Sequence, residues 1–371
     1  MRVSEDIKNL IAYKPGKPIA ETQREFGISR VIKLASNENP LGPSPKAIEA
    51  LRAHLNDLHR YPDPGGFELS QKISKVWNIN KNKIALGNGS NEIIDLLIRI
   101  FCEPGEKIAT TEKAFLAYPI CAQAARVKTV AVPLRADFTI DLIAMANMVL
   151  NDTNIRLVFI PNPNNPTGTY VNRTEVEQFL NKVGNRPDLL IVFDEAYNEF
   201  VRAQDYASGQ EWLNQYPSVV VMRTFSKVYG LAGLRLGVMM ADPEVIDLYH
   251  KVRNPFNTNE LAQVAATAAI EDTEYLRASQ KVVWEGLDQI YKGLRELDLN
   301  FLESQANFVL FDTQREAIQV YDLLLRQGLI LRPVANYGLP RHLRWTVGLK
   351  EENLIILKAL KEILIKVHPM K

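Results

Sequence analysis

Short apolar runs alternate with longer stretches of helical periodicity between about residues 45 and 270. Several runs are apolar at every position, among them LVFI, LLIVF and VVVM, as strands buried on both faces require. This alternation predicts an α/β fold, in which a mostly parallel sheet is sandwiched by helices. The predicted strands are Lys83–Leu86, Lys107–Thr111, Thr129–Pro133, Ile155–Ile160, Leu189–Phe193, Val219–Met222 and Leu236–Met240.

The pattern differs at both ends of the chain. The first 45 residues are predicted to form an arm, because prolines interrupt them and only Val31–Leu34 looks like a regular extended segment. After about residue 270 the pattern predicts a smaller α+β unit. Its expected elements are Thr273–Leu297, Asn307–Phe311, Glu316–Gln327, Leu329–Arg332, Leu343–Val347 and a final helix with Leu357, Leu360, Leu364 and Val367 on one face. We therefore expect an arm (1–45) packed with a small domain (271–371), and a large domain (46–270) between them in sequence.

Length and composition agree with two domains and limit the partners. A chain of 371 residues exceeds the ~250–300 at which single cores stop growing. The net charge is +1, so no overall field favours nucleic acid or an anionic membrane. No apolar run reaches the ~18 residues of a spanning helix, and no signal peptide is recognisable at the start, so we expect a cytoplasmic protein.

Cysteine and histidine usage indicates no metal site. Cys102 and Cys121 stand in apolar surroundings without CxxC spacing, as buried thiols do. The five histidines form no HExxH or paired-ligand pattern. Chemistry must therefore come from other groups.

Polar groups stand at the ends of four predicted strands. The segment PNPNNPTG, with Asn165, follows Ile155–Ile160, and Asp194 and Tyr197 follow the next strand. Ligands of such sheets bind at the carboxyl ends of the strands. Pyridoxal phosphate needs an amine for its aldehyde, a carboxylate for its ring nitrogen and donors for its phenolate oxygen. Lys227 supplies the amine and Asp194 the carboxylate. Asn165 and Tyr197 supply the donors to the phenolate oxygen.

The same edge offers a place for a phosphate. GNGSN follows the first strand and opens a predicted helix, so the N–H groups of Ser90 and Asn91 can bind an anion together with the Ser226 hydroxyl and Arg235. Each feature alone has an ordinary explanation: a solvated loop lysine, an aspartate that caps a helix, a glycine turn that lacks the P-loop pattern. The ordered set at strand ends is the specific signal.

Several segments resemble a known family. NPNNPTG, DEAY and TFSKVYGLAGLRLG are similar to fold-type I aminotransferases, and RYPDPGG and LASNENPLGPSP resemble the histidinol-phosphate aminotransferases. The resemblance extends from Tyr13 to the final helix. It implies that the large domain binds pyridoxal phosphate as a Schiff base on Lys227, and that Asp194, Asn165, Tyr197, Ser226 and Arg235 have the roles given above. It also implies a homodimer, in which Tyr61 reaches the partner's cofactor phosphate.

One segment departs from the family pattern. Some members have a tyrosine in a PxYxxY segment where this chain reads KAFLAY, with Phe115 at that tyrosine's position. Phe115 can stack on the pyridine ring but cannot donate a hydrogen bond, and a place in the core is its alternative. The Asn165–Pro166 bond is a candidate cis peptide.

The resemblance also implies the substrate. Arg344, in LRWTVG, resembles the arginine that grips an acidic group, and its fork suits carboxylate or phosphate. Arg332 and Tyr13 resemble the groups that complete a phosphate site, with Asn37 near them. A strand-edge arginine and a packing tyrosine are the alternatives for Arg332 and Tyr13. The implied reaction converts L-histidinol phosphate and 2-oxoglutarate into imidazole acetol phosphate and L-glutamate, by ping-pong kinetics with Lys227 as general base.

Three alternatives stay open at this point. Close relatives on this scaffold transaminate phenylalanine or tyrosine. Threonine-phosphate decarboxylase shares fold and cofactor and would release CO2 without a keto acid. A non-catalytic regulator is the third, although the sequence carries no DNA-binding domain or basic surface.

Overall fold

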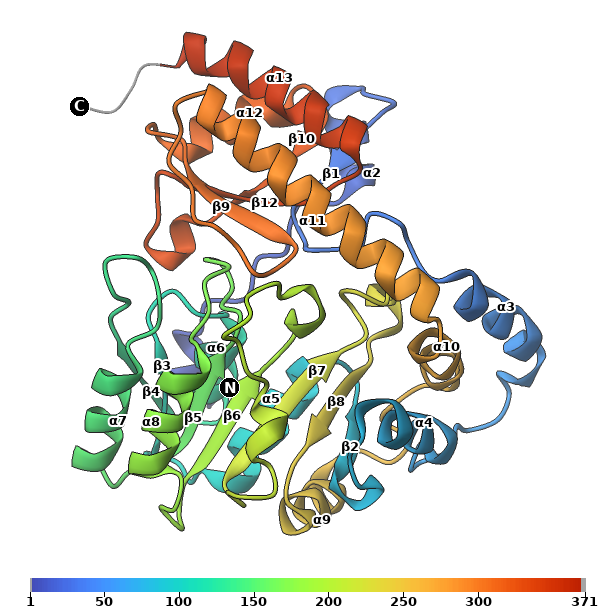
Figure 1. Cartoon of the computed structure of the whole chain (residues 1–371), viewed down its shortest axis with the longest axis vertical. Helices are drawn as coiled ribbons and strands as arrows, with labels where there is room; N and C mark the ends of the chain where they lie inside the picture. Colours follow the sequence, from blue (N-terminus) through green and yellow to red (C-terminus); the bar gives the residue numbers. More distant parts are fainter. Residues whose placement is uncertain (1, 368–371) are drawn as a thin grey trace.

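The computed structural model describes residues 2–367 and is built around a seven-stranded sheet (Figure 1). The strand order is β2-β8-β7-β6-β5-β3-β4, and β8 alone runs antiparallel to both of its neighbours. The strands are β2 (Ile84–Gly87), β3 (Lys107–Thr111), β4 (Lys128–Val132), β5 (Ile155–Pro161), β6 (Leu190–Asp194), β7 (Val219–Thr224) and β8 (Gly237–Met240). The prediction of a mainly parallel sheet is confirmed, and each predicted strand lies within two residues of its observed bounds.

Helices cover both faces of this sheet. In β5, Leu157 and Phe159 face one apolar cluster, whereas Val158 and Ile160 face another, because successive side chains of a strand point to opposite sides. The first cluster contains side chains of α5 (Ser90–Phe101), α6 (Ala117–Ala124) and α9 (Pro243–Val252). The second contains side chains of α4 (Phe67–Trp77), α7 (Leu142–Asn151), α8 (Arg173–Val183) and α10 (Glu260–Ile270), with α3 (Pro45–His54) packed on α10.

A smaller unit sits above the large sheet in Figure 1, in orange and red. Its three-stranded sheet has the order β11-β12-β9 and is antiparallel throughout. These strands are β9 (Phe308–Asp312), β11 (Arg332–Pro333) and β12 (His342–Thr346), and the helices are α11 (Thr273–Glu296), α12 (Ala317–Leu325) and α13 (Lys350–Lys366). The predicted strand Leu329–Arg332 is divided, because β10 (Leu329–Ile330) pairs instead with β1 (Ile32–Lys33).

The prediction that the arm holds only one regular segment is wrong. It contains two helices, α1 (Glu5–Lys8) and α2 (Ile19–Phe26). Pro18 stands at the N-cap of α2, where a fixed φ and a missing N–H cost little, and Gly27 ends the helix with a φ of +66°. The prolines that suggested an irregular arm are therefore compatible with a helix that starts directly after one of them. Short 3-10 helices complete the chain: η1 (Leu55–Asp57), η2 (Lys81–Lys83), η3 (Asn198–Phe200), η4 (Gly209–Trp212), η5 (Ala232–Leu234) and η6 (Ala335–Tyr337).

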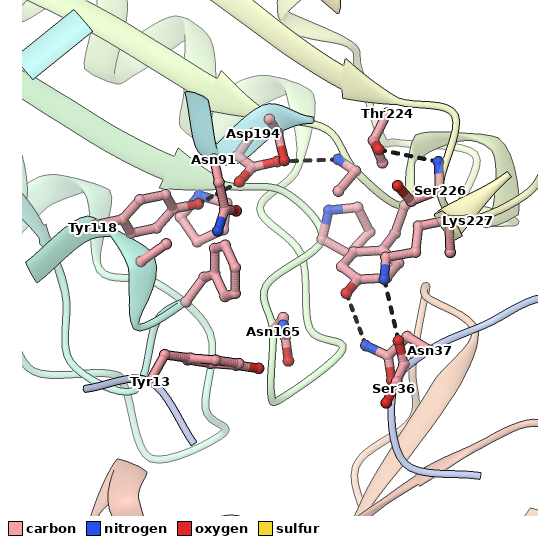
Figure 2. Close-up of a pocket in the computed structure, with 18 of the residues that line it drawn as sticks. Tyr13, Ser36, Asn37, Asn91, Tyr118, Asn165, Asp194, Thr224, Ser226 and Lys227 are labelled. Carbon is pink, nitrogen blue, oxygen red and sulfur yellow. Dashed lines mark hydrogen bonds between the residues drawn. The ribbon is translucent and has the colours of Figure 1, made fainter. Parts of the chain in front are cut away.

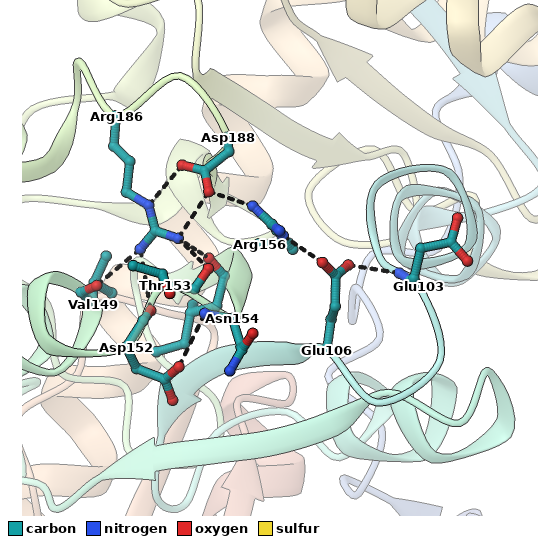
Figure 3. Close-up of polar contacts among 10 residues, drawn as sticks. Glu103, Glu106, Val149, Asp152, Thr153, Asn154, Arg156, Arg186 and Asp188 are labelled. Carbon is teal, nitrogen blue, oxygen red and sulfur yellow. Dashed lines mark hydrogen bonds and ion pairs between the residues drawn. The ribbon is translucent and has the colours of Figure 1, made fainter.

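An arginine network fixes the amino-terminal ends of the central strands (Figure 3). Arg186 donates to the carbonyl oxygens of Val149 at 2.8 Å and Ile155 at 2.8 Å, so it joins the end of α7 to the start of β5. Arg156 pairs with Glu106 at 2.6 Å. These contacts lie at the opposite ends of the strands from Asn165, Asp194 and Lys227, and we assign them to the stability of the sheet. Within residues 2–367, each helix is too short or too polar to cross a lipid bilayer.

Candidate active site

A cavity of about 440 Å³ lies at the carboxyl ends of β5, β6 and β7 (Figure 2). Residues from the arm, the large sheet and β12 line it together. Most of the predicted site residues are among them: Tyr13, Asn37, Ser90, Asn91, Phe115, Asn165, Asp194, Tyr197, Ser226, Lys227, Arg235 and Arg344. The topology thus brings together groups that are far apart in the sequence.

Lys227 presents its amine to this cavity. Its Nζ donates to the backbone oxygen of Ser36 at 3.3 Å and lies 5.8 Å from the centre of the Tyr197 ring. Burial, and then the positive charge of Arg344, lower the pKa of Lys227 from 10.5 to about 8. Since only the neutral amine is a nucleophile, the site prepares Lys227 to attack a carbonyl group near neutral pH.

Asp194 is the last residue of β6 and is buried. Burial raises the pKa of this carboxyl, and the hydrogen bond from Tyr118, at 2.6 Å between Oη and Oδ2, opposes that rise. A positive charge bound beside Asp194 would counteract this rise in pKa and hold the carboxylate ionised. The carboxylate is therefore suited to a cationic ring nitrogen.

Tyr118 is a site residue that the sequence did not predict. Its ring is fully buried and stacks on Phe159, with 4.7 Å between the ring centres. It stands on α6, three residues after Phe115, and the two rings meet edge to face. In the segment KAFLAY the sequence predicts a role for Phe115 only. The contact of Tyr118 with Asp194 depends on how α6 packs against β6, which the sequence does not show.

Arg344 and Asn165 form a second pair across the cavity. Arg344 Nη1 donates to Asn165 Oδ1 at 2.5 Å, and Nη2 donates to the backbone oxygen of Ala35 at 2.7 Å. Within residues 2–367, the buried Nε of Arg344 has no hydrogen-bond partner. With its Oδ1 engaged, Asn165 can turn its amide Nδ2 towards a ligand. The Asn165–Pro166 bond is cis, as predicted, and so is Asn162–Pro163, which was not predicted.

An anion cradle lies at the start of α5. Arg235 Nη1 lies 3.4 Å from Ser226 Oγ, and the guanidinium packs against Gly89, the N-cap of α5. A Cβ at Gly89 would stand 2.6 Å from Arg235 Nη2, and the φ of +78° also favours glycine. The N–H groups of Ser90 and Asn91, the Ser226 hydroxyl and the Arg235 charge therefore face one small volume.

Arg332 lies beside the cavity, whose lining does not include it. It is opposite Arg344 in the register of β11 and β12, and both side chains are buried. Arg332 Nη2 donates to the backbone oxygen of Lys14 at 2.6 Å, and the guanidinium lies 5.6 Å from the centre of the Tyr13 ring. Within residues 2–367, neither arginine forms a salt bridge to a carboxylate of the protein. Two neighbouring cations without a counter-ion favour an anionic ligand.

Tyr61 is not brought into the cavity of its own chain. Its side chain is 82% exposed and stacks on Phe256 with 4.6 Å between the ring centres. Phe115 lines the cavity and also packs against the apolar cluster of α5, α6 and α9. Asn37 also lines it, but both polar atoms of its side-chain amide already have protein partners.

Comparisons with known proteins identify similar chains over nearly the whole length. The profile of the family "Aminotransferase class I and II" matches residues 29–360. A histidinol-phosphate aminotransferase of Bdellovibrio bacteriovorus is 54% identical over 100% of both chains, and one of Nitrosococcus oceani is 44% identical over 96% of this chain and 95% of its own. The crystal structure of histidinol-phosphate aminotransferase from Sinorhizobium meliloti in complex with pyridoxal-5'-phosphate is similar, with a TM-score of 0.89, 26% identity and 98% of both chains covered.

Proposed function

The chain belongs to the class I and II aminotransferases and, within them, to the histidinol-phosphate aminotransferase family, and we propose that its cavity transfers the amino group of L-histidinol phosphate to 2-oxoglutarate with pyridoxal phosphate on Lys227. The observation that carries the substrate assignment is the pair Arg332 and Arg344. These two buried arginines are opposite each other on β11 and β12, and Arg344 lines the cavity that contains the Lys227 amine.

The residues present fit pyridoxal phosphate. A side chain at position 89 would collide with the Arg235 guanidinium, so the glycine lets Arg235 stay at the cradle beside Ser226, and a positive charge would stabilise the ionised form of the buried Asp194. When bound, this cofactor supplies an aldehyde for the amino group and a ring that accepts electrons. We assign the ring nitrogen to Asp194 and the phenolate oxygen to Asn165 and Tyr197.

Lys227 has two tasks in this proposal. Its amine would hold the cofactor until the substrate's amino group takes its place, and the freed amine would then serve as general base for the 1,3-proton shift that transamination requires. Its lowered pKa of about 8 leaves part of the amine neutral near pH 7, as a general base requires. Phe115, which lines the cavity, would stack on the face of the bound ring and exclude water from it.

The arginine pair binds the acidic groups of both substrates in turn. We place the phosphate of histidinol phosphate on Arg332, Arg344 and Tyr13, and a carboxylate of glutamate on Arg344, whose Nε lacks a partner in the described chain. Because one cavity must accept both molecules alternately, ping-pong kinetics follow.

The assembly belongs to the same proposal. Tyr61, Phe67 and Phe256 are exposed apolar side chains close to one another, and a partner subunit that covers them could receive Tyr61 in its own phosphate cradle. We therefore propose a homodimer, and a cytoplasmic location as expected for a biosynthetic enzyme of this family. We also propose the domain bounds predicted from the sequence: an arm (1–45), a large domain (46–270) and a small domain (271–371).

A half-reaction assay tests the function. Purified protein loaded with cofactor is mixed with histidinol phosphate, phenylalanine, threonine phosphate or glutamate, and the visible absorption of the cofactor is followed. We expect histidinol phosphate to give the highest kcat/KM of the amines and 2-oxoglutarate to reverse the change. Preference for phenylalanine would make the protein an aromatic aminotransferase, and CO2 release from threonine phosphate without a keto acid would make it a decarboxylase.

A further inference from the structure

The side-chain amide of Asn37 is held between two other side chains. Its Nδ2 donates to Tyr197 Oη at 2.8 Å, and its Oδ1 accepts from Thr346 Oγ1 at 3.0 Å. Asn37 is 1% exposed and has a φ of +56°, in the left-handed region. The three residues come from the arm, from the loop after β6 and from β12, so the amide joins three parts of the molecule. Figure 2 shows Asn37 close to Lys227.

Thr346 fixes which way the amide faces. Its Oγ1 accepts the backbone N–H of Asn37 at 2.9 Å, and its hydroxyl proton then needs an acceptor. Asn37 Oδ1 is that acceptor, so Nδ2 must point to Tyr197. The backbone oxygen of Asn37 accepts from Asn307 Nδ2 at 3.1 Å, which holds the residue in place from the other side.

This orientation decides where the Tyr197 proton goes. An amide nitrogen has no free electron pair, so Tyr197 cannot donate to Asn37 and its proton stays available for another acceptor. Within residues 2–367, Tyr197 Oη accepts the bond from Asn37 and makes no hydrogen bond as donor. Burial raises the pKa of Tyr197, while the charge of Arg344 and the hydrogen bond from Asn37 oppose that rise and so strengthen the phenol as a donor.

We propose that Asn37 and Thr346 are positioning residues that keep the Tyr197 proton aimed at the phenolate oxygen of the cofactor and thereby set the proton affinity of the Lys227 nitrogen. The proposal rests on the proposed function, because it requires pyridoxal phosphate on Lys227. The position of β12 then affects the orientation of the Tyr197 hydroxyl, because a shift of Thr346 away from the arm would break its hydrogen bond to the Asn37 amide.

The sign of the effect follows from competition for the phenolate. A donor to that oxygen withdraws negative charge that would otherwise hold the proton on the neighbouring Lys227 nitrogen. Loss of the donor therefore raises the pH at which this proton leaves. We expect Tyr197→Phe to raise this pH most, and Asn37→Ala to raise it by about 0.5 pH units, because the hydrogen bond from Asn37 is neutral and acts only through Tyr197.

The test is a spectroscopic pH titration of the cofactor-loaded protein without substrate. It compares wild type, Asn37→Ala, Tyr197→Phe and the double variant. If Asn37 acts through Tyr197, the midpoint of the double variant equals that of Tyr197→Phe alone. An equal shift from Asn37→Ala in both backgrounds would overturn the proposal, because the amide would then act on the site without the phenol.

Threonine variants test the orientation of the amide. Thr346→Val keeps the shape but removes the hydroxyl, so its midpoint should rise as in Asn37→Ala, and Thr346→Ser should restore the wild-type value. Thr313→Val is the matched control, because Thr313 is buried in the same unit and its hydroxyl contacts only backbone groups away from the cavity. An unchanged midpoint in Thr346→Val, or an equal rise in Thr313→Val, would overturn the proposal.

Two failures are distinguishable. If Tyr197→Phe shifts the midpoint and Asn37→Ala does not, only the role of Asn37 is wrong. If wild type shows no cofactor absorption, or Tyr197→Phe leaves the midpoint in place, the assignment of the cofactor site fails and the proposal with it.

Discussion

The amine of Lys227 must be neutral to attack an aldehyde. Its pKa of about 8 predicts that cofactor-free protein combines with pyridoxal phosphate faster as pH rises, with a midpoint about pH 8. Stopped-flow absorbance measures this rate. Arg344→Gln should move the midpoint to higher pH, because it removes the second cause of the lowered pKa. A midpoint near the ~10.4 of an exposed lysine would contradict the prediction.

The role of the Tyr118 hydroxyl group can be tested by removing it alone. Tyr118→Phe removes the hydrogen bond to Asp194 and leaves the stacked ring in place. A hydrogen bond to a charged group contributes ~1.5–3 kcal/mol, so we expect kcat to fall by roughly ten-fold or more while KM changes little. Tyr216→Phe is the control, because its buried hydroxyl donates to Asn181 away from the cavity. Equal losses in both variants would indicate a purely structural role.

At the scale of elements, the start of α5 predicts a requirement for glycine. Gly89→Ala forces a Cβ to within 2.6 Å of Arg235 Nη2, so we expect the affinity for pyridoxal phosphate to fall by roughly ten-fold or more. Gly105→Ala is the matched control, because its φ of +95° brings similar strain while no atom lies within 4 Å of the added Cβ. Both variants should lose about 1 kcal/mol of stability. Equal cofactor affinity in the two, measured by fluorescence titration, would argue against the cradle.

The strand pair β11 and β12 predicts separate roles for its two arginines. Arg332→Gln should lower kcat/KM for histidinol phosphate by roughly ten-fold or more and affect glutamate less, because we place only the phosphate on Arg332. Arg344→Gln should weaken both substrates. Arg341→Gln is the control, because Arg341 directly precedes β12 and its ion pair is with Asp312 of β9. Equal losses for both substrates in Arg332→Gln would remove the distinction.

Whether an element could be predicted from the sequence depends on its burial and length. The central strands were predictable, because burial on both faces leaves apolar runs such as Leu189–Phe193, and the polar groups at their ends follow from topology. The helix α2 was missed because it is short and follows a proline. Tyr118 and the contacts of Asn37 could not be predicted, because they depend on which surfaces α6, β6 and β12 bring together.

At the scale of the whole molecule, Tyr61 lies outside the phosphate cradle of its own chain. Three of the groups required at the phosphate cradle lie on one chain, at Ser90, Ser226 and Arg235, whereas Tyr61 is 82% exposed and stacks on Phe256 outside the cavity. A C₂ dimer would resolve this, since each subunit would give its Tyr61 and receive that of its partner. The exposed position of Tyr61 would then be the donor half of a shared site.

Hybrid dimers test this arrangement directly. Tyr61→Ala and Lys227→Ala should each be nearly inactive, the first by loss of cofactor affinity and the second by loss of the amine. When the two are unfolded, mixed in equal amounts and refolded, half of the dimers combine one subunit of each kind, and one of their two sites has both Lys227 and Tyr61. Activity should therefore return to about a quarter of the wild-type value, as random pairing in a C₂ dimer requires. If Tyr61 acted within its own chain, each hybrid site would lack one of the two groups, and mixing would restore nothing.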